Sequence, residues 1–315
     1  MNVILITIIL VILLFFILLF ITRPSDTPTL IPKPILKDQD DANPKTWEYY
    51  DMVERIENSM PRTDLQTVVH YPVFYINLDR QPDKRRYMES QFAVYNISPT
   101  YRVPGIDGKH VQPHEFESSY TFTEYLEPHQ IGCVMSHVRA IEMFYNTGAD
   151  IGLVIEDDLN FAPLGHVDFT IPDIVAAAPS DWEIISLHTT SCNHYDDDNR
   201  YNPTLCMYKR TSVKEHCLSA AAYLVKRSTA KYILDLVLQD NVIRIFPIRP
   251  GYPEWGVADS YFYSLVPTYY VTPSVVFPYM PDYTFHASGE SFIKSYLDHG
   301  FPKLVKNKPL QIMNI

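Results

Sequence analysis

The sequence predicts an open α/β sheet, mostly parallel and Rossmann-like, with helices on both faces. Short apolar runs rich in β-branched residues are typical of strands buried on both faces, and they recur at 73–78, 151–155, 182–187 and 220–225. Stretches with helical spacing lie between these runs, and such alternation favours parallel pairing. Acidic residues directly follow the run at 151–155. Because ligands of such sheets bind at the carboxyl ends of strands, we expect a binding site there.

Residues 1–23 contain a long apolar stretch. Positions 3–21 are aliphatic or aromatic apart from Thr7, which is long enough for a membrane-spanning helix and too long for the core of a typical signal peptide. The sequence therefore predicts a single-pass N-terminal membrane anchor, in an ER- or Golgi-type or other host membrane. Basic residues after the span, such as Arg23, mildly favour a cytoplasmic position for the rest of the chain, but long domains override that bias, so the orientation stays open.

Residues 24–70 are predicted to form a proline-rich stalk and a short helix. Four prolines between positions 24 and 34 favour extended geometry. Over 45–60, apolar residues fall on one helical face: Trp47, Tyr50, Val53 and Ile56. Residues 71–315 are expected to form one domain, which is large for one core but normal for an α/β protein.

The composition narrows the class of partner. Asp and Glu number 37 against 26 Lys and Arg, giving a formal net charge of −11, and this excess of acids argues against a nucleic-acid groove. Twenty-three tyrosines and twenty-five prolines suggest a loop-rich protein with amphipathic aromatic surfaces, which are common where sugars bind.

The four cysteines, at 133, 192, 206 and 217, show no zinc-binding spacing. Two interpretations stay open. Cys192 and Cys206 flank a polar loop and can pair in an oxidising compartment, or all four cysteines are buried thiols.

The first strand, Val73–Leu78, runs into a helix with Pro82 near its first turn, which Asp79 or Asp83 can cap. The first turn also holds three basic residues, Lys84, Arg85 and Arg86. Basic residues there oppose the helix dipole. They either bind an anion, such as a nucleotide diphosphate, or are simply solvated.

A short strand at 100–104 and a turn at 105–108 precede the next helix. Glu127 and Pro128 open this helix and Gly148 ends it, with apolar residues at helical spacing between them: Ile131, Val134, Met135, Val138 and Ile141. The same helix carries His137. A lone histidine on a helix more often has a structural role than binds a ligand, and the sequence leaves both roles open for His137.

The run Ile151–Ile155 ends in three carboxylates, Glu156, Asp157 and Asp158. Residues two apart on a strand point the same way, so we expect Glu156 and Asp158 to converge while Asp157 turns aside. Two such carboxylates suit Mg²⁺ or Mn²⁺, and a metal held this way usually completes its shell with substrate phosphates. The alternative is a solvated turn at the end of a strand.

Later segments continue the alternation. A helix over 171–178 is stopped by Pro179, and a strand over 182–187 ends at His188. The polar segment 189–203, with Asp196–Asp198, is predicted to be a solvated loop. The strand at 220–225 precedes a helix that Ser228 can cap and that runs to about Leu238. Residues 254–259 then lead into 261–266, and 271–278 are expected to be extended.

Four of these segments, in this order, resemble blocks of glycosyltransferase family 25, which includes bacterial lipooligosaccharide galactosyltransferases and procollagen galactosyltransferases. They are Val73–Arg80 with Asp83 and Arg85, Gln130–His137, Leu153–Asp158 and Ala221–Val225, with a weaker match at Asp259. Two features depart from the family. Gln130 stands where the family usually has Glu, and many members lack an N-terminal anchor.

The resemblance implies a GT-A type fold, with 71–315 as the catalytic domain, a UDP-sugar donor and inversion at the anomeric carbon. It predicts a metal-dependent hexosyltransferase. We expect galactose or glucose to move to a hydroxyl of a glycan, a lipid-linked saccharide or a protein.

Site roles follow from the resemblance and from the chemistry of transfer. Asp158 is expected to ligate Mn²⁺ or Mg²⁺ directly, Glu156 to contact the ion through water or to contact the ribose, and His286 to add a third ligand. Inversion requires a base for the acceptor hydroxyl, for which Asp259 is the candidate and Glu254 the reserve. The nucleotide and donor contacts are assigned to Asn77, Asp79, Arg80, Arg85, His137 and Asp157.

Two other classes of function remain as alternatives. A catalytically inactive, membrane-tethered sugar-binding homologue would bind UDP-sugars without turnover. A metal-dependent hydrolase would use the same acids to activate water, and it would release free sugar or phosphate without an acceptor.

Overall fold

The computed structural model describes residues 69–112, 114–118, 126–167, 169–189, 206–209, 219–245, 257–272, 274–278 and 313–314. The predicted anchor at 3–21, the stalk, the helix at 45–60 and the Asp196–Asp198 loop lie outside these residues. Within these ranges, no helix is both long enough and apolar enough to cross a membrane. Cys133 is a free thiol, and Cys192 is not among the described residues, so its pairing with Cys206 stays a prediction.

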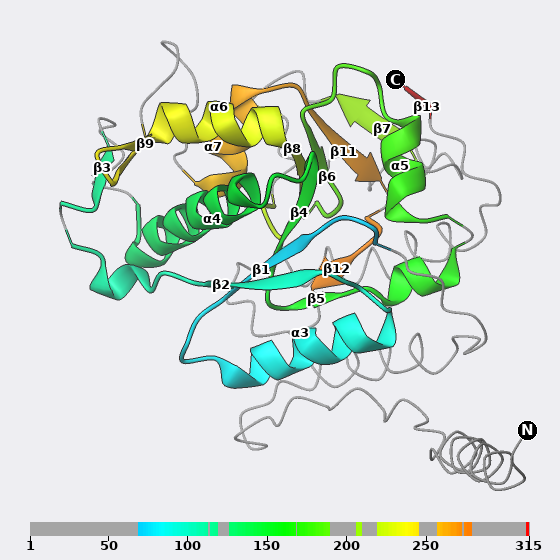
Figure 1. Ribbon diagram of the computed structural model, residues 1–315, viewed down its shortest axis with the longest axis horizontal. Helices are drawn as coiled ribbons and strands as arrows, with labels where there is room; N and C mark the ends of the chain where they lie inside the picture. The colour runs from blue at the N-terminus through cyan, green and yellow to red at the C-terminus, as the bar shows by residue number, and fades with distance from the viewer. Residues whose placement is uncertain are drawn as a thin grey trace, which may run out of the picture. The chain divides into compact units, whose positions relative to one another are not determined.

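The main sheet has eight strands in the order β13-β7-β11-β6-β8-β4-β1-β2 (Figure 1). Their bounds are β1 Val73–Asn77, β2 Thr100–Pro104, β4 Ile151–Glu156, β6 Ile184–Ser186, β7 Cys206–Lys209, β8 Ala222–Lys226, β11 Thr268–Thr272 and β13 Met313–Asn314. The predicted runs at 73–78, 151–155, 182–187 and 220–225 therefore all contain strands of this sheet, and three of them lie at its centre.

The sheet is mixed but mostly parallel. Strands β2, β1 and β4 run parallel to one another, as do β6 and β11. Between these groups β8 runs antiparallel to both β4 and β6, so the five strands β2, β1, β4, β6 and β11 share one direction. Because β8 is antiparallel to its neighbours, it needs no crossover helix to join them. The apolar run at 220–225 does not indicate in which direction β8 runs.

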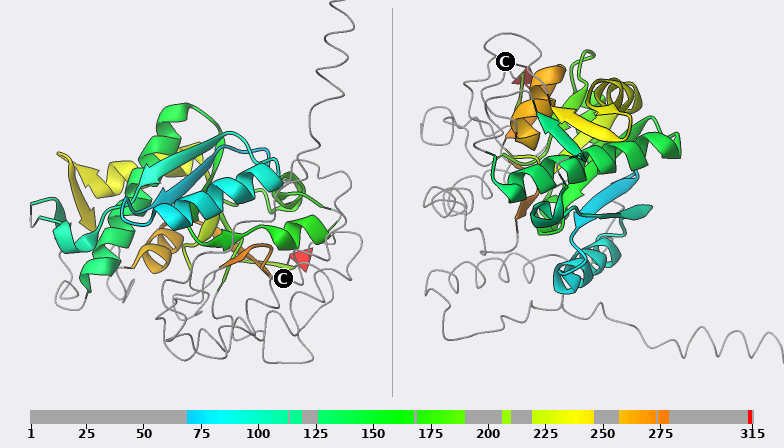
Figure 2. Two further views of the ribbon diagram at one scale, coloured as in Figure 1. Left: turned by 90° about the horizontal axis from the view of Figure 1, so that it is seen from below. Right: turned by 90° about the vertical axis from the view of Figure 1, so that its left-hand side faces the viewer.

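Helices cover both faces of the sheet, as predicted. They are α3 Pro82–Val94, α4 Pro128–Thr147, α5 Ile171–Ala177, α6 Arg227–Val237 and α7 Ala258–Leu265. Successive side chains of a strand point to opposite faces. On β1, Phe74 faces α4, with its ring centroid 5.8 Å from that of Phe144, and Tyr75 faces α3, with its centroid 5.2 Å from that of Phe92. The right-hand view of Figure 2 shows β1 and β2 between these two helices.

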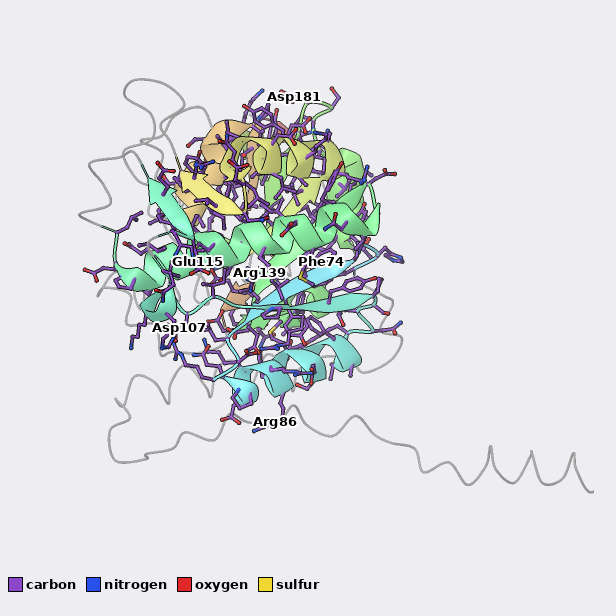
Figure 3. The ribbon with its side chains drawn as sticks, turned by 60° about the vertical axis from the view of Figure 1, so that its left-hand side comes forward. Phe74, Arg86, Asp107, Glu115, Arg139 and Asp181 are labelled. Atoms are coloured by element: carbon purple, nitrogen blue, oxygen red, sulfur yellow. The ribbon has the colours of Figure 1, made fainter. Side chains whose placement is uncertain are left out.

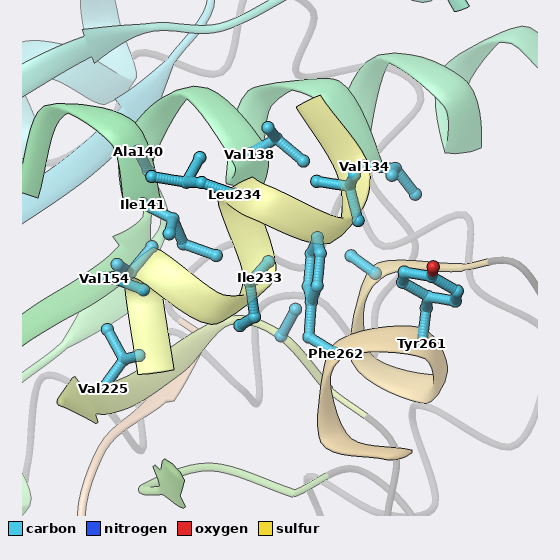
Figure 4. Close-up of a cluster of buried hydrophobic side chains, with 14 of the residues drawn as sticks. Val134, Val138, Ala140, Ile141, Val154, Val225, Ile233, Leu234, Tyr261 and Phe262 are labelled. Carbon is cyan, nitrogen blue, oxygen red and sulfur yellow. The ribbon is translucent and has the colours of Figure 1, made fainter. Parts of the chain in front are cut away.

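The core on the α4 side joins three helices to the sheet (Figure 4). Val138 and Ile141 of α4 lie beside Ile233 of α6 and Phe262 of α7, over Val154 of β4, and all five are buried. Their burial removes apolar surface from water, which is the main favourable contribution to folding. The core therefore fixes α4 against β4, the strand that leads into the three carboxylates.

The predicted ends of α4 agree with the structure, whereas the predicted caps at the starts of α3 and α6 do not. At α4, Glu127 and Gln130 form a capping box and Gly148 ends the helix at φ 78°, a left-handed conformation that glycine adopts without strain. At α3 the N-cap is Gln81, without a side-chain capping bond, so the predicted caps Asp79 and Asp83 are wrong.

The acids predicted to cap α3 have other partners. Asp79 accepts a hydrogen bond from Arg102, and Asp83 pairs with Arg86. At α6, β8 runs directly into the helix through Lys226, so the predicted cap Ser228 already lies inside it.

Smaller elements surround the main sheet. They are a three-stranded sheet of β3 Phe116–Ser118, β10 Val242–Ile245 and β9 Leu238–Gln239, a pair of β5 Leu159–Asn160 with β12 Phe277–Pro278, and the short 3-10 helices Gly108–His110 and Ala162–His166.

Candidate active site at the carboxyl end of β4

A cavity of about 190 Å³ lies at the carboxyl end of β4. Its lining includes five of the residues predicted from the sequence, namely Arg80, His137, Glu156, Asp157 and Asp158. Acids from β4 and its following turn thus meet side chains from α4 and from the connection between β1 and α3. This is the edge of the sheet at which ligands of α/β proteins bind.

A larger hollow of about 480 Å³ lies at the opposite end of β4, beside Ile151. Its cationic side chains already have partners. The Arg227 guanidinium lies 4.4 Å from the centroid of the Tyr145 ring, and Lys226 Nζ lies 4.6 Å from that of Trp182. We therefore place the candidate active site at the carboxylate end.

Lys84 of α3 links Asp157 and Asp158. Its Nζ lies 3.1 Å from Asp158 Oδ2 and 3.5 Å from Asp157 Oδ1. Burial alone lowers the pKa of Lys84, but the charges of Asp158 and Asp157 outweigh burial and raise it above its usual value. The expectation that Asp157 turns aside is therefore wrong. Strand alternation holds only to Glu156, where β4 ends, and a turn brings the next two carboxylates to the same ammonium group.

Asn77, the last residue of β1, orients Asp157. Asn77 Nδ2 donates to Asp157 Oδ2 at 2.6 Å and to the Gln81 carbonyl oxygen at 3.0 Å. Its own Oδ1 accepts from Arg102 Nε at 3.0 Å. Asn77 therefore orients Asp157 without lining the cavity. Asp79 is 83% exposed in its side chain and pairs with Arg102, so it lies outside the cavity lining.

The two arginines predicted to bind the nucleotide differ. Arg80 lines the cavity and its Nε donates to Asp107 Oδ2 at 2.8 Å; Figure 3 labels Asp107 on the loop before α4. Arg85 does not line the cavity, because its guanidinium pairs with Glu89 one turn further along α3 at 2.7 Å. Arg86 is likewise exposed on α3 (Figure 3).

Glu156 faces α4. Its Oε1 lies 3.4 Å from His137 Nε2 and 4.0 Å from Cys133 Sγ. The other ring nitrogen of His137, Nδ1, lies 3.2 Å from the buried Tyr223 hydroxyl. Burial raises the pKa of Glu156, but the hydrogen bond and charge of His137, together with the charge of Lys84, hold it below its usual range.

The floor of the cavity depends on a close approach of backbones. At Gly108 a Cβ atom would lie 1.5 Å from the Pro128 carbonyl oxygen, so the loop lies directly against the first turn of α4. The Ile106 amide also donates to Ser136 Oγ at 2.8 Å. These contacts fix the 105–108 turn beside the acids.

The remaining predicted residues belong to later segments. Asp259 is in the first turn of α7. After burial and the charge of Glu156, its negative charge contributes to raising the pKa of the Cys133 thiol, so Asp259 lies near the α4 side of the cavity. It is not among the lining residues. Glu254 and His286 lie outside the part of the chain that the structure describes, and their predicted roles stay predictions.

Sequence reasoning noted Lys84 without selecting it as a site residue, although helical spacing could have done so. Lys84 precedes Tyr87 and Met88 by three and four residues, and both are buried, which places Lys84 on the inward stripe of α3. Cys133 precedes His137 by four residues on α4. No local pattern indicated Tyr223, whose hydroxyl reaches His137 from β8.

The pH dependence of stability tests the environment of Asp157. Burial and the charge of Asp158 raise the pKa of Asp157 from 3.8 to about 6. An acid whose pKa is higher in the folded protein than in the unfolded chain costs stability as the pH rises between those two values. Each pKa unit corresponds to about 1.4 kcal/mol. The gain in unfolding free energy from Asp157→Asn is therefore expected to be small below about pH 4 and to reach about 1–3 kcal/mol above about pH 6, as measured by urea unfolding.

Asp181→Asn is the matched control with the opposite sign. Hydrogen bonds from Lys209 and Tyr269 lower the pKa of Asp181, so removing its charge is expected to cost stability at neutral pH and to cost less in acid. A gain from Asp157→Asn that does not change with pH would contradict the buried, ionised state of Asp157.

Comparisons with known proteins agree on one family. Residues 70–245, more than half of the chain, match the family described as "Glycosyltransferase family 25 (LPS biosynthesis protein)". The chain is 31% identical over 101 residues to a "Glycosyltransferase 25 family member" of Drosophila melanogaster, and 30% identical over 101 residues to one of Drosophila pseudoobscura pseudoobscura. Each alignment covers 29% of this chain and 16% of the relative, so the chain aligns with about a sixth of the length of these relatives.

Proposed function

Because the chain belongs to glycosyltransferase family 25, we propose that it is a metal-dependent, inverting hexosyltransferase. The donor is a UDP-sugar, with galactose or glucose favoured. The acceptor is a hydroxyl of a glycan, a lipid-linked saccharide or a protein. The apolar residues 3–21 support a single N-terminal membrane anchor for this activity.

One observation carries the proposal most directly. Four carboxylates, those of Asp107, Glu156, Asp157 and Asp158, line the same cavity at the carboxyl end of β4 together with the cationic side chains of Lys84 and Arg80. With all four acids ionised, their charge of −4 and the +2 of Lys84 and Arg80 leave about −2, so a nucleotide diphosphate would be repelled unless a cation came with it. Carboxylate oxygens are the ligands that Mg²⁺ and Mn²⁺ prefer, so the residues present fit such an ion.

The residues divide the work of the donor site. Asp158 would hold the cation, with Glu156 as predicted or with the adjacent Asp157 as a further oxygen ligand. When bound, the ion would stabilise the negative charge that develops on the leaving diphosphate. Lys84 and Arg80 both line the cavity, so they would contact the anionic donor. Asn77 keeps Asp157 oriented through its 2.6 Å hydrogen bond.

A base is required for the acceptor hydroxyl, because inversion proceeds by a single in-line displacement. Asp259 remains the proposed base. Its charge acts on Cys133 of α4, which supports a position beside the cavity rather than on a distant surface. Glu254 is the reserve, and His286 remains the proposed third metal ligand.

The test uses the full-length chain in detergent with UDP-galactose and UDP-glucose. We expect slow hydrolysis of a donor in Mn²⁺, transfer to a hydroxyl acceptor, and loss of both in a chelator. Binding of UDP-sugars without any turnover would favour an inactive sugar-binding homologue. Release of sugar or phosphate that an acceptor neither diverts nor accelerates would favour a hydrolase, and absence of UDP-sugar binding would overturn the donor assignment.

A further inference from the structure

Three side chains at one edge of the cavity together offer a mixed set of metal-binding atoms, unlike the neighbouring aspartates, which offer oxygen alone. Cys133 offers sulfur, His137 nitrogen and Glu156 oxygen, and all three donor atoms lie within 4.8 Å of one another. Cys133 and His137 are four residues apart on α4, so they lie on one face of that helix. Glu156 approaches from the end of β4.

We propose that Cys133, His137 and Glu156 form a second metal site, which takes a borderline-soft divalent cation such as Zn²⁺. Glu156 would then ligate this second ion, so of the two arrangements proposed for the donor site the one in which Asp157 and Asp158 hold the cation applies, and that site offers oxygen atoms alone. Sulfur and imidazole ligands favour zinc and related transition metals, whereas carboxylates alone favour Mg²⁺ or Mn²⁺. The proposal does not require that the chain be a transferase.

The distance between the nitrogen and oxygen atoms fits zinc, and the sulfur atom lies somewhat farther away. For tetrahedral zinc, bond lengths of about 2.0–2.1 Å to nitrogen, about 2.0–2.2 Å to oxygen and about 2.3 Å to sulfur place a nitrogen–oxygen ligand pair about 3.4 Å apart and a sulfur–oxygen pair about 3.6 Å apart. The His137 Nε2 to Glu156 Oε1 distance is 3.4 Å, and the Cys133 Sγ to Glu156 Oε1 distance is 4.0 Å. The Cys133 sulfur lies within 4.8 Å of the His137 ring nitrogen, so the thiol would move toward the other two ligands to complete the geometry.

The surroundings of the three ligands also favour a cation. Histidine ligands usually have their second ring nitrogen hydrogen-bonded to another group, which fixes the ring, and His137 Nδ1 has the Tyr223 hydroxyl at 3.2 Å. Burial, followed by the charges of Glu156 and Asp259, raises the pKa of the Cys133 thiol, and a bound cation would offset these effects because it deprotonates a coordinating thiol. All three ligands come from regular elements held by the core, so they need little ordering when the ion binds.

The site also has an open side. Cys133, His137 and Glu156 all line the cavity, so a metal held there would keep a coordination position free for water or for a ligand in the cavity. Three protein ligands with an open fourth position are typical of catalytic rather than purely structural zinc sites. An ion here would be adjacent to the donor site and accessible from it.

Cobalt gives the sharpest test, because Co²⁺ substitutes for Zn²⁺ and shows a near-ultraviolet sulfur-to-metal charge-transfer band only when a thiolate ligates it. We expect the full-length protein, stripped with a chelator, to bind about one equivalent of Co²⁺ with a thiolate charge-transfer band, and Zn²⁺ to abolish that band. Cys133→Ser is expected to remove the band. His137→Gln is expected to weaken Zn²⁺ binding by more than about tenfold, and Tyr223→Phe by about tenfold.

Two variants provide controls. His129→Ala removes a histidine that lines the same cavity but is not part of the three-ligand cluster, and it is expected to keep the band and the Zn²⁺ affinity. Asp158→Ala is expected to keep the band while losing transfer, which separates this site from the proposed function. Thermal unfolding of each variant confirms that it is folded, and Cys133→Ala serves as a second sulfur-free variant.

The alternative is that Glu156 and His137 form a simple ion pair. A wild-type protein without a thiolate band, or a folded Cys133→Ser or Cys133→Ala variant that keeps the band, would overturn the second metal site. Mn²⁺ bound at Asp157 and Asp158 would give no such band, so failure of the transferase proposal and failure of this one are distinguishable.

Discussion

Asp158→Ala is expected to lower the rate of sugar transfer by at least about 100-fold, with Mn²⁺ and UDP-sugar saturating. The physical reason is loss of the proposed direct metal ligand. A bound cation contributes several kcal/mol of charge stabilisation in the transition state, and each 1.4 kcal/mol corresponds to about a factor of ten in rate. Steady-state measurement of kcat with varied donor and varied Mn²⁺ checks the result.

The fold should survive this change. Asp158 lies in the turn that follows β4 rather than in the apolar core, and its charge repels that of Asp157. The matched control is Asp235→Asn, which removes an exposed carboxylate from α6 and should leave both activity and unfolding temperature close to those of the wild type. Full activity of a folded Asp158→Ala protein would exclude Asp158 as the direct ligand.

The second large effect is on stability. Phe144→Ala is expected to cost about 3–5 kcal/mol of unfolding free energy, because Phe144 is fully buried on α4 with its ring 5.8 Å from that of Phe74. For a chain of this size each kcal/mol shifts the unfolding temperature by about 2–4 °C, so we expect a decrease of roughly 6–20 °C. Calorimetry or circular dichroism measures it.

Gly152, which packs against the Phe144 ring, provides a further test of this prediction. A Cβ atom at Gly152 would lie 2.4 Å from Phe144 Cδ2, so Gly152→Ala alone should overpack the core and cost about 1–3 kcal/mol. In the double variant the new methyl group enters the space left by the ring. The double variant should therefore cost less than the sum of the two single changes, by about 0.5–3 kcal/mol.

Additive effects of the two changes would show that Gly152 is not packed against the ring. Tyr232→Ala, on the exposed face of α6 with 47% of its surface accessible, is the control. We expect it to change the unfolding free energy by less than about 0.5 kcal/mol.

Features whose cause is local were predictable from the sequence. The apolar run at 151–155 is β4, and the segment from Pro128 to Gly148 is α4 with both ends where Pro and Gly indicated them. The position of the acids at the carboxyl end of a central strand followed from the same pattern. Each of these features depends on residues close together in the chain.

Features set by tertiary contacts were not predictable. The direction of β8 depends on which strands it joins, and a short apolar run is the same in either direction. Asp157 meets Lys84 because the strand ends at Glu156, and no residue type marks that end. The approach of Glu156 to His137 depends on how α4 crosses the sheet, which is set by the packing of the core.

The position of β4 in the sheet has a consequence for synthesis of the chain on the ribosome. One neighbour of β4, β1, precedes it, but the other, β8, ends at Lys226, about 70 residues after Glu156. At about 5–20 residues per second, roughly 4–14 s of translation separate the two. During that interval one edge of the apolar strand β4 is unpaired, so a nascent chain stalled before Lys226 would expose it to chaperones and proteases.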